Sequence, residues 1–338
     1  MKIAIQKGIR FTLGWEEYCN ANSIPYKLVN AFDNDIIEQL SDCDGFMWQH
    51  IQGTKDELLA KQLLYSLEEK GLKVFPNFRT TWHFDDKVGQ KYLLEAIGAP
   101  LVPTYVFYTK KDALSWINTT IFPKVFKLRG GAGASNVSLV RTKKEAIRLI
   151  NKAFGRGIAQ NSRLDALKER WRQYRSGLKP FIYVLKGIGR LFILSESAKL
   201  LNPEKGYVYF QEFIPNNNCD VRLIVIDGRY AYGMKRVVRE GDFRASGSGS
   251  FVYEDLDKKT IKIAFDVAKR LKLQSVAFDF VYNENGYPLI IEMSYGYGTT
   301  GSSQCKGYWD EDLIWHEEKP NPFGWMVDAL IRDINEKL

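Results

Sequence analysis

Short apolar runs alternate with longer amphipathic segments in the N-terminal part of the chain. The runs have the length of strands, whereas the segments between them carry apolar residues at helical spacing. In chain order, these strand and helix candidates are residues 2–6, 15–21, 26–29, 36–40, 45–49, 58–70 and 73–76. Strands and helices that alternate at this pitch predict βαβ units with a parallel sheet. Because this part lacks a GxGxxG motif, we do not expect a dinucleotide site in it.

A second pattern begins at residue 85, where two acidic residues precede a predicted helix that ends at Gly98 and Pro100. Residues 122–140 then read as strand, small-residue loop, strand. The loop is not a Walker A loop, since it lacks GK[ST] and no helix follows it. Taken alone, the stretch favours an ordinary hairpin turn. A glycine-rich hairpin can also close over phosphate groups, and the cations Lys127 and Arg129 lie beside it.

A basic, irregular insertion follows a predicted helix at residues 142–154. It covers residues 155–205 and contains a helix candidate from Ser162 to Tyr174. The favoured interpretation of its charges is a solvated face, and recognition of an anionic partner is the weaker alternative.

The C-terminal part returns to strands. Residues 207–215 form one strand candidate, and residues 220–236 form two alternating strands about a tight Asp-Gly turn. Arg222 and Arg236 lie on these otherwise apolar strands, where an unpaired guanidinium would be destabilising. A polar loop at residues 240–250 and an amphipathic helix at residues 260–271 follow.

The last predicted hairpin runs from Ala277 to Ser294, with a turn rich in Asn and Gly. Asp279 and Glu292 are single carboxylates on its two apolar strands, and each would need compensation for lost hydration. Mg²⁺ prefers oxygen ligands, and Ser294 would point to the same face as Glu292. The hairpin therefore predicts a magnesium site, although strand ends that face water would explain the same residues.

Composition restricts the class of protein only broadly. The 338 residues suffice for two or three lobes, and the net charge of +8 favours anionic ligands without separating nucleotide, nucleic acid, glycan and membrane surface. The four cysteines form no CxxC pair, which favours a reduced cytoplasmic setting over a disulfide framework or a cysteine metal site. The N-terminus does not resemble a signal peptide, and no run of about eighteen apolar residues predicts a membrane span.

Taken together, these elements resemble the ATP-grasp superfamily of carboxylate–amine ligases from about residue 2 to residue 300. The helix that begins with Asp86 and Lys87, the lysine strand with its glycine loop, and the metal hairpin occur in the order of that family. Asp220-Val221-Arg222, Met234-Lys235-Arg236 and Asp242-Phe243-Arg244 resemble the branch that adds glutamate to ribosomal protein.

The resemblance implies an ATP-grasp fold of mixed α/β and α+β type. Its expected parts are an N-terminal βα lobe at 1–80, a linker helix at 81–103, a lid with the basic insertion at 104–210, and a C-terminal lobe with the metal site at 211–338. ATP is expected between the lid and the last lobe.

The resemblance also implies roles for individual residues. Arg236 and Arg244 would be catalytic and bind the substrate carboxylate. Mg²⁺, with Mn²⁺ as an alternative, would be held by Asp279, Glu292 and Ser294. ATP would be bound by Lys87, Lys127, Gly130, Gly131, Ala132, Gly133, Gln211, Glu212, Phe213, Ile214, Asp220 and Arg222. Lys91 and Lys124 compete with Lys87 and Lys127 for the two lysine roles.

The chain departs from the family at several positions. Ser294 stands where the last metal ligand is usually Asn, which affects a direct contact by this residue more than metal binding itself. Ser246 also replaces an Asn of the glutamate-ligase pattern. The ending after Glu292 is similar to that of ATP-grasp proteins that accompany surface-polysaccharide synthesis.

Three functions remain open at this point. The first is a ligase that joins a carboxylate to an amine through an acyl phosphate, with an amino acid or a sugar uronate as substrate. The second is a kinase of a small hydroxylated metabolite on the same fold. The third is a non-catalytic ATP-binding regulator; no nucleic-acid partner is expected, because the basic residues form no recognisable nucleic-acid motif.

Overall fold

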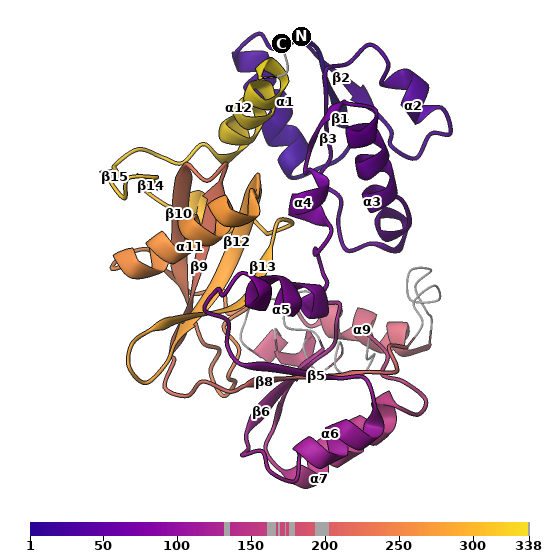
Figure 1. The fold of residues 1–338 in the computed structure, drawn as a ribbon, viewed down its shortest axis with the longest axis vertical. Coiled ribbons are helices and arrows are strands. Elements are labelled where there is room, and N and C mark those ends of the chain that lie inside the picture. Colours follow the sequence, from indigo (N-terminus) through magenta and orange to yellow (C-terminus); the bar gives the residue numbers. More distant parts are fainter. Residues whose placement is uncertain are drawn as a thin grey trace. The chain divides into compact units, whose positions relative to one another are not determined.

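A computed structural model shows the fold of the chain (Figure 1). It describes residues 1–131, 136–160, 167, 170–172, 174–175, 180–192 and 203–336. The chain forms two compact units, which we describe separately. Unit 1 comprises Met1–Phe84, Leu93–Pro100 and Asn216–Leu338, and unit 2 comprises Asp85–Tyr92 and Leu101–Pro215.

The N-terminal part of unit 1 is a four-stranded parallel sheet. Its strand order is β2-β1-β3-β4, with helices between successive strands, as the alternating pattern predicted. The elements are β1 (Ile3–Gln6), α1 (Phe11–Ala21), β2 (Tyr26–Val29), α2 (Ile36–Gln39), β3 (Gly45–Met47), α3 (Thr54–Glu69), β4 (Lys73–Phe75) and α4 (Phe78–Thr81).

The C-terminal part of unit 1 is a seven-stranded antiparallel sheet of order β13-β12-β9-β10-β14-β15, in which β11 also pairs with β10. Its elements are β9 (Cys219–Ile226), β10 (Tyr230–Val237), β11 (Phe251–Val252), α11 (Lys258–Leu271), β12 (Ser275–Tyr282), β13 (Pro288–Ser294), the 3₁₀ helix η1 (Ser302–Gln304), β14 (Tyr308–Asp310), β15 (Trp315–His316) and α12 (Pro322–Asn335).

One hydrophobic core joins these two parts of unit 1. Ile3 and Trp15 from the N-terminal part pack in the same cluster as Ile224, Ala277 and Leu330 from the C-terminal part. Helix α12 closes this core, because its buried face includes Met326, Val327, Leu330 and Ile334. The first and last parts of the described chain therefore stabilise each other.

Unit 2 contains a separate four-stranded antiparallel sheet of order β5-β8-β6-β7. Its elements are β5 (Thr104–Phe107), α6 (Lys110–Trp116), β6 (Lys124–Lys127), β7 (Val137–Val140), α7 (Lys143–Ala153), α9 (Ile182–Phe192) and β8 (Val208–Glu212), and helix α5 (Lys87–Ala96) begins in this unit. A core of residues from α6, α7 and the strands covers one face of the sheet.

The described residues thus form three separate sheets rather than one continuous doubly wound sheet. The lid predicted at 104–210 falls within unit 2, whereas the helix assigned to a linker at 81–103 is divided between the units. The helix predicted from Ser162 to Tyr174 falls largely outside the described residues.

Candidate functional site

One face of the C-terminal sheet changes from apolar to charged along its strands. On β9, alternate residues on this face run from Asp220 and Arg222 to Ile224 and Ile226, and the two isoleucines belong to the shared core. The strand register places Asp279 of β12 opposite Arg222. One face of the sheet is therefore charged at one end, where Asp220, Arg222 and Asp279 lie, and belongs to the buried core at the other end.

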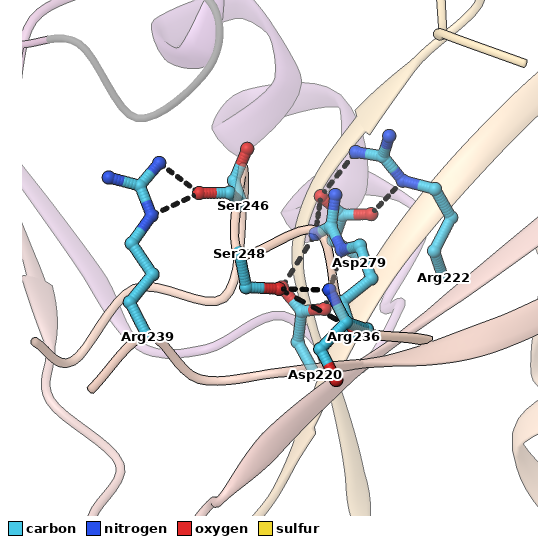
Figure 2. Close-up of polar contacts among 8 residues, drawn as sticks. Asp220, Arg222, Arg236, Arg239, Ser246, Ser248 and Asp279 are labelled. Atoms are coloured by element: carbon cyan, nitrogen blue, oxygen red, sulfur yellow. Dashed lines mark hydrogen bonds and ion pairs between the residues drawn. The ribbon is translucent and has the colours of Figure 1, made fainter. Parts of the chain in front are cut away.

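The charged end of this face is a connected network of ion pairs (Figure 2). Arg222 donates from Nε and Nη2 to the two oxygens of Asp279 at 2.7 and 2.8 Å. Arg236 donates to both oxygens of Asp220 at 2.7 and 2.5 Å, and its Nη2 also donates to Asp279 at 2.8 Å. Asp220, Arg236 and Asp279 are buried. These ion pairs compensate Asp279 for its lost hydration. They also give Arg222 and Arg236 the charged partners that guanidiniums on apolar strands need.

The network determines the charge of Asp279. Burial alone would raise the pKa of this carboxyl, but the guanidiniums of Arg222 and Arg236 hold the pKa well below its usual range. A carboxylate that ionises more readily in the folded protein stabilises the fold at pH values above its unfolded pKa of about 3.9, and this contribution is lost as the pH falls through the folded pKa.

We therefore expect a pH-dependent effect of Asp279→Asn on stability. The free energy of unfolding of the variant should fall furthest below that of the parent above about pH 5, and this difference should shrink below about pH 4. Urea unfolding over this pH range measures it. Asp266→Asn, which removes an exposed carboxylate paired with Lys262, is the control with little pH-dependent difference. A difference for Asp279→Asn that does not change with pH would contradict the depressed pKa.

Glu292 lies directly opposite Asp279 in the register of β12 and β13, next to a bulge between Asp279 and Phe280. Ser294, two residues further on, lies on the same face and opposite Ala277. The predicted hairpin and the predicted proximity of the two carboxylates are thus present. The roles of these residues as metal ligands stay predictions.

The donor set of these residues fits a magnesium ion. A carboxylate has about four lone-pair sites, and Asp279 uses three of them for Arg222 and Arg236. Its Oδ1 therefore keeps one site that a cation can share with Glu292. Among the described residues, no cluster of three or more His, Cys, Asp or Glu side chains could hold a metal. Two carboxylates completed by phosphate oxygens and water are the ligand set that Mg²⁺ commonly takes in nucleotide sites.

A loop from Arg239 to Ser250 carries the second arginine that was predicted to be catalytic. Arg244 donates from Nε and Nη2 to Asp242 at 2.9 and 2.6 Å, and its side chain is partly exposed. The buried Arg239 donates from Nε to the carbonyl of Ser246 at 2.6 Å and thereby ties the loop to the end of β10 (Figure 2). The sequence analysis did not single out Arg239.

In unit 2, the backbone of the glycine loop already binds carboxylates. The N–H of Arg129 donates to Glu204 at 3.0 Å, the N–H of Gly130 donates to Glu204 at 3.3 Å, and the N–H of Gly131 donates to Asp85 at 2.7 Å. Gly131 has a φ of 111°, which favours glycine. Consecutive amide donors that converge on anionic oxygens can bind phosphate in the same way.

Lys87 lies beside this loop, at the start of α5. Its Nζ donates to the carbonyl of Gly131 at 2.8 Å, and its backbone N–H donates to the carbonyl of Arg129 at 3.0 Å. The structure therefore brings the predicted residues Lys87, Gly130 and Gly131 together. Ala132 and Gly133, which were predicted with them, lie outside the described residues.

The strand register separates the two lysines of β6. Lys124 pairs with Glu212 of β8, with Nζ 2.7 Å from Oε2, on the face that carries the α6–α7 core. Lys127 lies opposite Tyr209 and points to the other face, together with Val125 and Gln211. Alternation thus favours Lys127 for the phosphate role, because Lys124 neutralises Glu212.

The remaining predicted nucleotide residues lie at the end of β8. Gln211 is buried and donates to Thr104 at 3.1 Å, so its amide organises the sheet. Phe213 and Ile214 follow the strand and are partly buried. The predicted roles of Gln211, Glu212, Phe213 and Ile214 in binding ATP stay predictions.

Comparison with solved structures defines the class of the fold. A RimK domain ATP-grasp protein from Sphaerobacter thermophilus superposes with a TM-score of 0.59 at 15% identity, over 97% of this chain and 99% of that chain. D-alanine–D-alanine ligase from Bacillus anthracis, complexed with ATP, gives a TM-score of 0.57 at 13% identity, over 100% and 99% of the two chains. The chain has the ATP-grasp fold.

Sequence comparison is consistent with the branch that the motifs resemble. Residues 189–313 match the RimK-like ATP-grasp domain. A probable alpha-L-glutamate ligase from Psychromonas ingrahamii is 31% identical over 36% of this chain and 43% of the relative, and another from Shewanella pealeana is 25% identical over 57% and 46%. The chain spans less than half of the length of these curated relatives. The resemblance to ATP-grasp proteins near the glutamate-ligase branch is thereby confirmed.

Proposed function

We propose that this protein is an ATP- and magnesium-dependent ligase that joins a carboxylate to an amine and releases ADP. The observation that carries the proposal is the pairing of Asp279 with Glu292 on a sheet face that also bears Arg222 and Arg236. Support comes from the named activity of the glutamate-ligase relatives and from the ATP-grasp fold.

The proposed reaction begins with transfer of the γ-phosphoryl group of ATP to the substrate carboxylate. The acyl phosphate that forms is then attacked by the amine, and phosphate leaves as the amide bond forms. Phosphoryl transfer needs positioning and charge neutralisation more than covalent help from protein. Magnesium held by Asp279 and Glu292 would neutralise phosphate charge, and Ser294 would contribute at most a neutral oxygen.

The residues of unit 2 would bind the phosphates of ATP. Lys87 and Lys127 would supply positive charge, and the amides of Gly130 and Gly131 would donate to phosphate oxygens in place of Glu204 and Asp85. A closed loop would also exclude water and thereby protect the acyl phosphate from hydrolysis.

The arginines would have two different roles. Arg244 lies on a loop and its side chain is partly exposed, so it is the better candidate to bind the substrate carboxylate. Arg236 is buried between Asp220 and Asp279, so it would position the metal carboxylate. Its predicted contact with substrate would require it to exchange one of these partners.

The substrate would be an amino acid or a sugar-linked uronate, as the family resemblance implies. A screen of ADP release over pairs of carboxylates and amines tests the whole proposal. Turnover that requires both partners is expected. ADP release with a hydroxyl acceptor alone would instead establish a kinase. ATP binding without turnover for any acceptor would indicate a non-catalytic regulator.

The glycine loop provides a test of nucleotide binding that does not need the substrates. Trypsin cleavage after the exposed Arg129 is expected to slow when a non-hydrolysable ATP analogue and magnesium are added, because the phosphates order the loop. Cleavage after Lys306, which is exposed in unit 1, serves as the internal control. Equal protection at both sites, or none at Arg129, would contradict a phosphate role for this loop.

A further inference from the structure

Helix α9 exposes apolar side chains to solvent. Phe181, which directly precedes the helix, and Ile182, Leu185 and Ile188 are between 42% and 53% exposed, whereas Val184 and Gly187 are buried. At about 100° per residue, the four exposed residues cover a sector of roughly 120°. This sector is wide and continuous, unlike the isolated apolar residues that most protein surfaces carry.

Aromatic side chains from a second helical segment extend the exposed sector. Trp171 and Tyr174 are 48% and 39% exposed, and their rings lie 5.8 Å apart. The ring of Tyr174 lies 5.2 Å from that of Phe181. Arg170 fixes the two segments together, since it donates to the carbonyl of Tyr183 at 3.0 Å and lies over the Tyr183 ring. We call Trp171, Tyr174, Phe181, Ile182, Leu185 and Ile188 the α9 surface.

Positive charge borders the α9 surface. Arg175 and Lys186 are exposed beside it, and the described residues between 167 and 192 include no Asp or Glu. In the sequence, residues 155–205 contain eleven Lys or Arg and four Asp or Glu, so this segment carries seven of the eight net positive charges of the chain. The partner of this surface should therefore combine an apolar phase with negative charge.

We propose that the α9 surface binds the face of an anionic lipid bilayer. The apolar side chains would enter the boundary between headgroups and acyl chains, while Arg175 and Lys186 would contact lipid phosphates. Trp171 and Tyr174 suit this boundary, because their rings are apolar and their polar atoms can stay hydrated. The attachment is peripheral: none of the described helices is long and apolar enough to cross a membrane.

Vesicle sedimentation of the full chain tests the proposal. The protein is expected to pellet with vesicles of phosphatidylcholine and phosphatidylglycerol in equal amounts and to stay in the supernatant with phosphatidylcholine alone. Raising the salt concentration should weaken the binding, because the positive charges act through screened attraction. The double variant Ile182→Gln with Leu185→Gln should bind at least tenfold more weakly, since both side chains would enter the apolar boundary.

A second pair of variants separates charge from apolar contact. Arg175→Gln with Lys186→Gln should weaken binding to the anionic vesicles about fivefold for each charge removed. Lys110→Gln with Lys111→Gln removes the same charge from exposed positions elsewhere in unit 2, and Ile121→Gln removes a side chain that is 81% exposed. These control variants are expected to bind as the parent does. Thermal unfolding shows whether each variant is folded.

Three results would overturn the proposal. One is that the parent protein does not pellet with the anionic vesicles at low salt. Another is that the α9 variants bind as well as the control variants do. The third is that sedimentation velocity without lipid shows a dimer and that the Ile182→Gln with Leu185→Gln variant abolishes it. This result would assign the surface to a second copy of the chain.

Discussion

Replacement of Glu292 by Gln is expected to reduce magnesium-dependent ADP formation about a hundredfold or more, while the protein remains folded. The change keeps the size of the side chain and removes one of the two charges that face each other across β12 and β13. Steady-state ADP release against magnesium concentration, with an accepted substrate pair, measures the effect.

The same hairpin offers controls for this experiment. Glu284→Gln makes the identical chemical change in the exposed turn and should leave the rate unchanged. Ser294→Ala should have a much smaller effect than Glu292→Gln, because water can replace a neutral oxygen. Combining Glu292→Gln with Asp279→Asn should lose less activity than the two separate losses together, because both residues would serve one ion. Near-normal turnover of Glu292→Gln at low magnesium would exclude this hairpin as the metal site.

Replacement of Arg236 by Met is expected to lower the free energy of unfolding by about 3–5 kcal/mol. The variant leaves the buried Asp220 without the guanidinium that binds both of its oxygens, and Asp279 loses one of its two arginines. Urea unfolding at neutral pH measures the loss. Arg229→Met makes the same change at a half-exposed position in the turn between β9 and β10, and it should alter the free energy of unfolding by less than about 0.5 kcal/mol.

A double variant tests the reason for this loss. Adding Asp220→Leu to Arg236→Met removes the stranded charge and should restore much of the stability. If Arg236→Met does not fold, Arg236→Lys provides the measurement, because it keeps the charge and loses the two parallel hydrogen bonds to Asp220. An effect of Arg236→Met no larger than that of Arg229→Met would show that the ion-pair network does not stabilise unit 1.

The hairpin itself was predictable, because the turn between Tyr282 and Pro288 is short and the two flanking apolar runs can pair in few ways. The facing of the two carboxylates was not fixed by that turn, since the regular register would place Ile291 opposite Asp279. The bulge between Asp279 and Phe280 places Glu292 opposite Asp279 instead. The separation of Lys124 from Lys127 follows from the same alternation, but only the pairing of β6 with β8 shows which face carries the core.

The ion pairs that Asp279 makes with Arg222 and Arg236 were not predictable, because they join strands that are distant in the sequence. Arg222 and Asp279 are 57 residues apart, and their contact requires β9 to pair with β12. Each residue looked anomalous by itself, as a charge on an apolar strand. The contact of Glu204 with the glycine loop could not be predicted either. Glu204 is one of four acidic residues in a basic segment, and only the fold of unit 2 brings it to the loop.

The C-terminal helix was missed although its sequence contains ordinary signals. Asn321 caps α12 by accepting the N–H of Gly324 at 3.1 Å, Pro322 occupies the first turn, and apolar residues follow at helical spacing.

The position of α12 has a consequence for the order in which the protein folds during synthesis. Residues 3–6 of β1 leave the ribosome early, but the helix that covers them lies at residues 322–335. Ile3, Ile5 and Trp15 therefore lack part of their final covering until almost all of the described chain has been translated. Until then, the nascent N-terminal part presents apolar surface of the kind that chaperones bind.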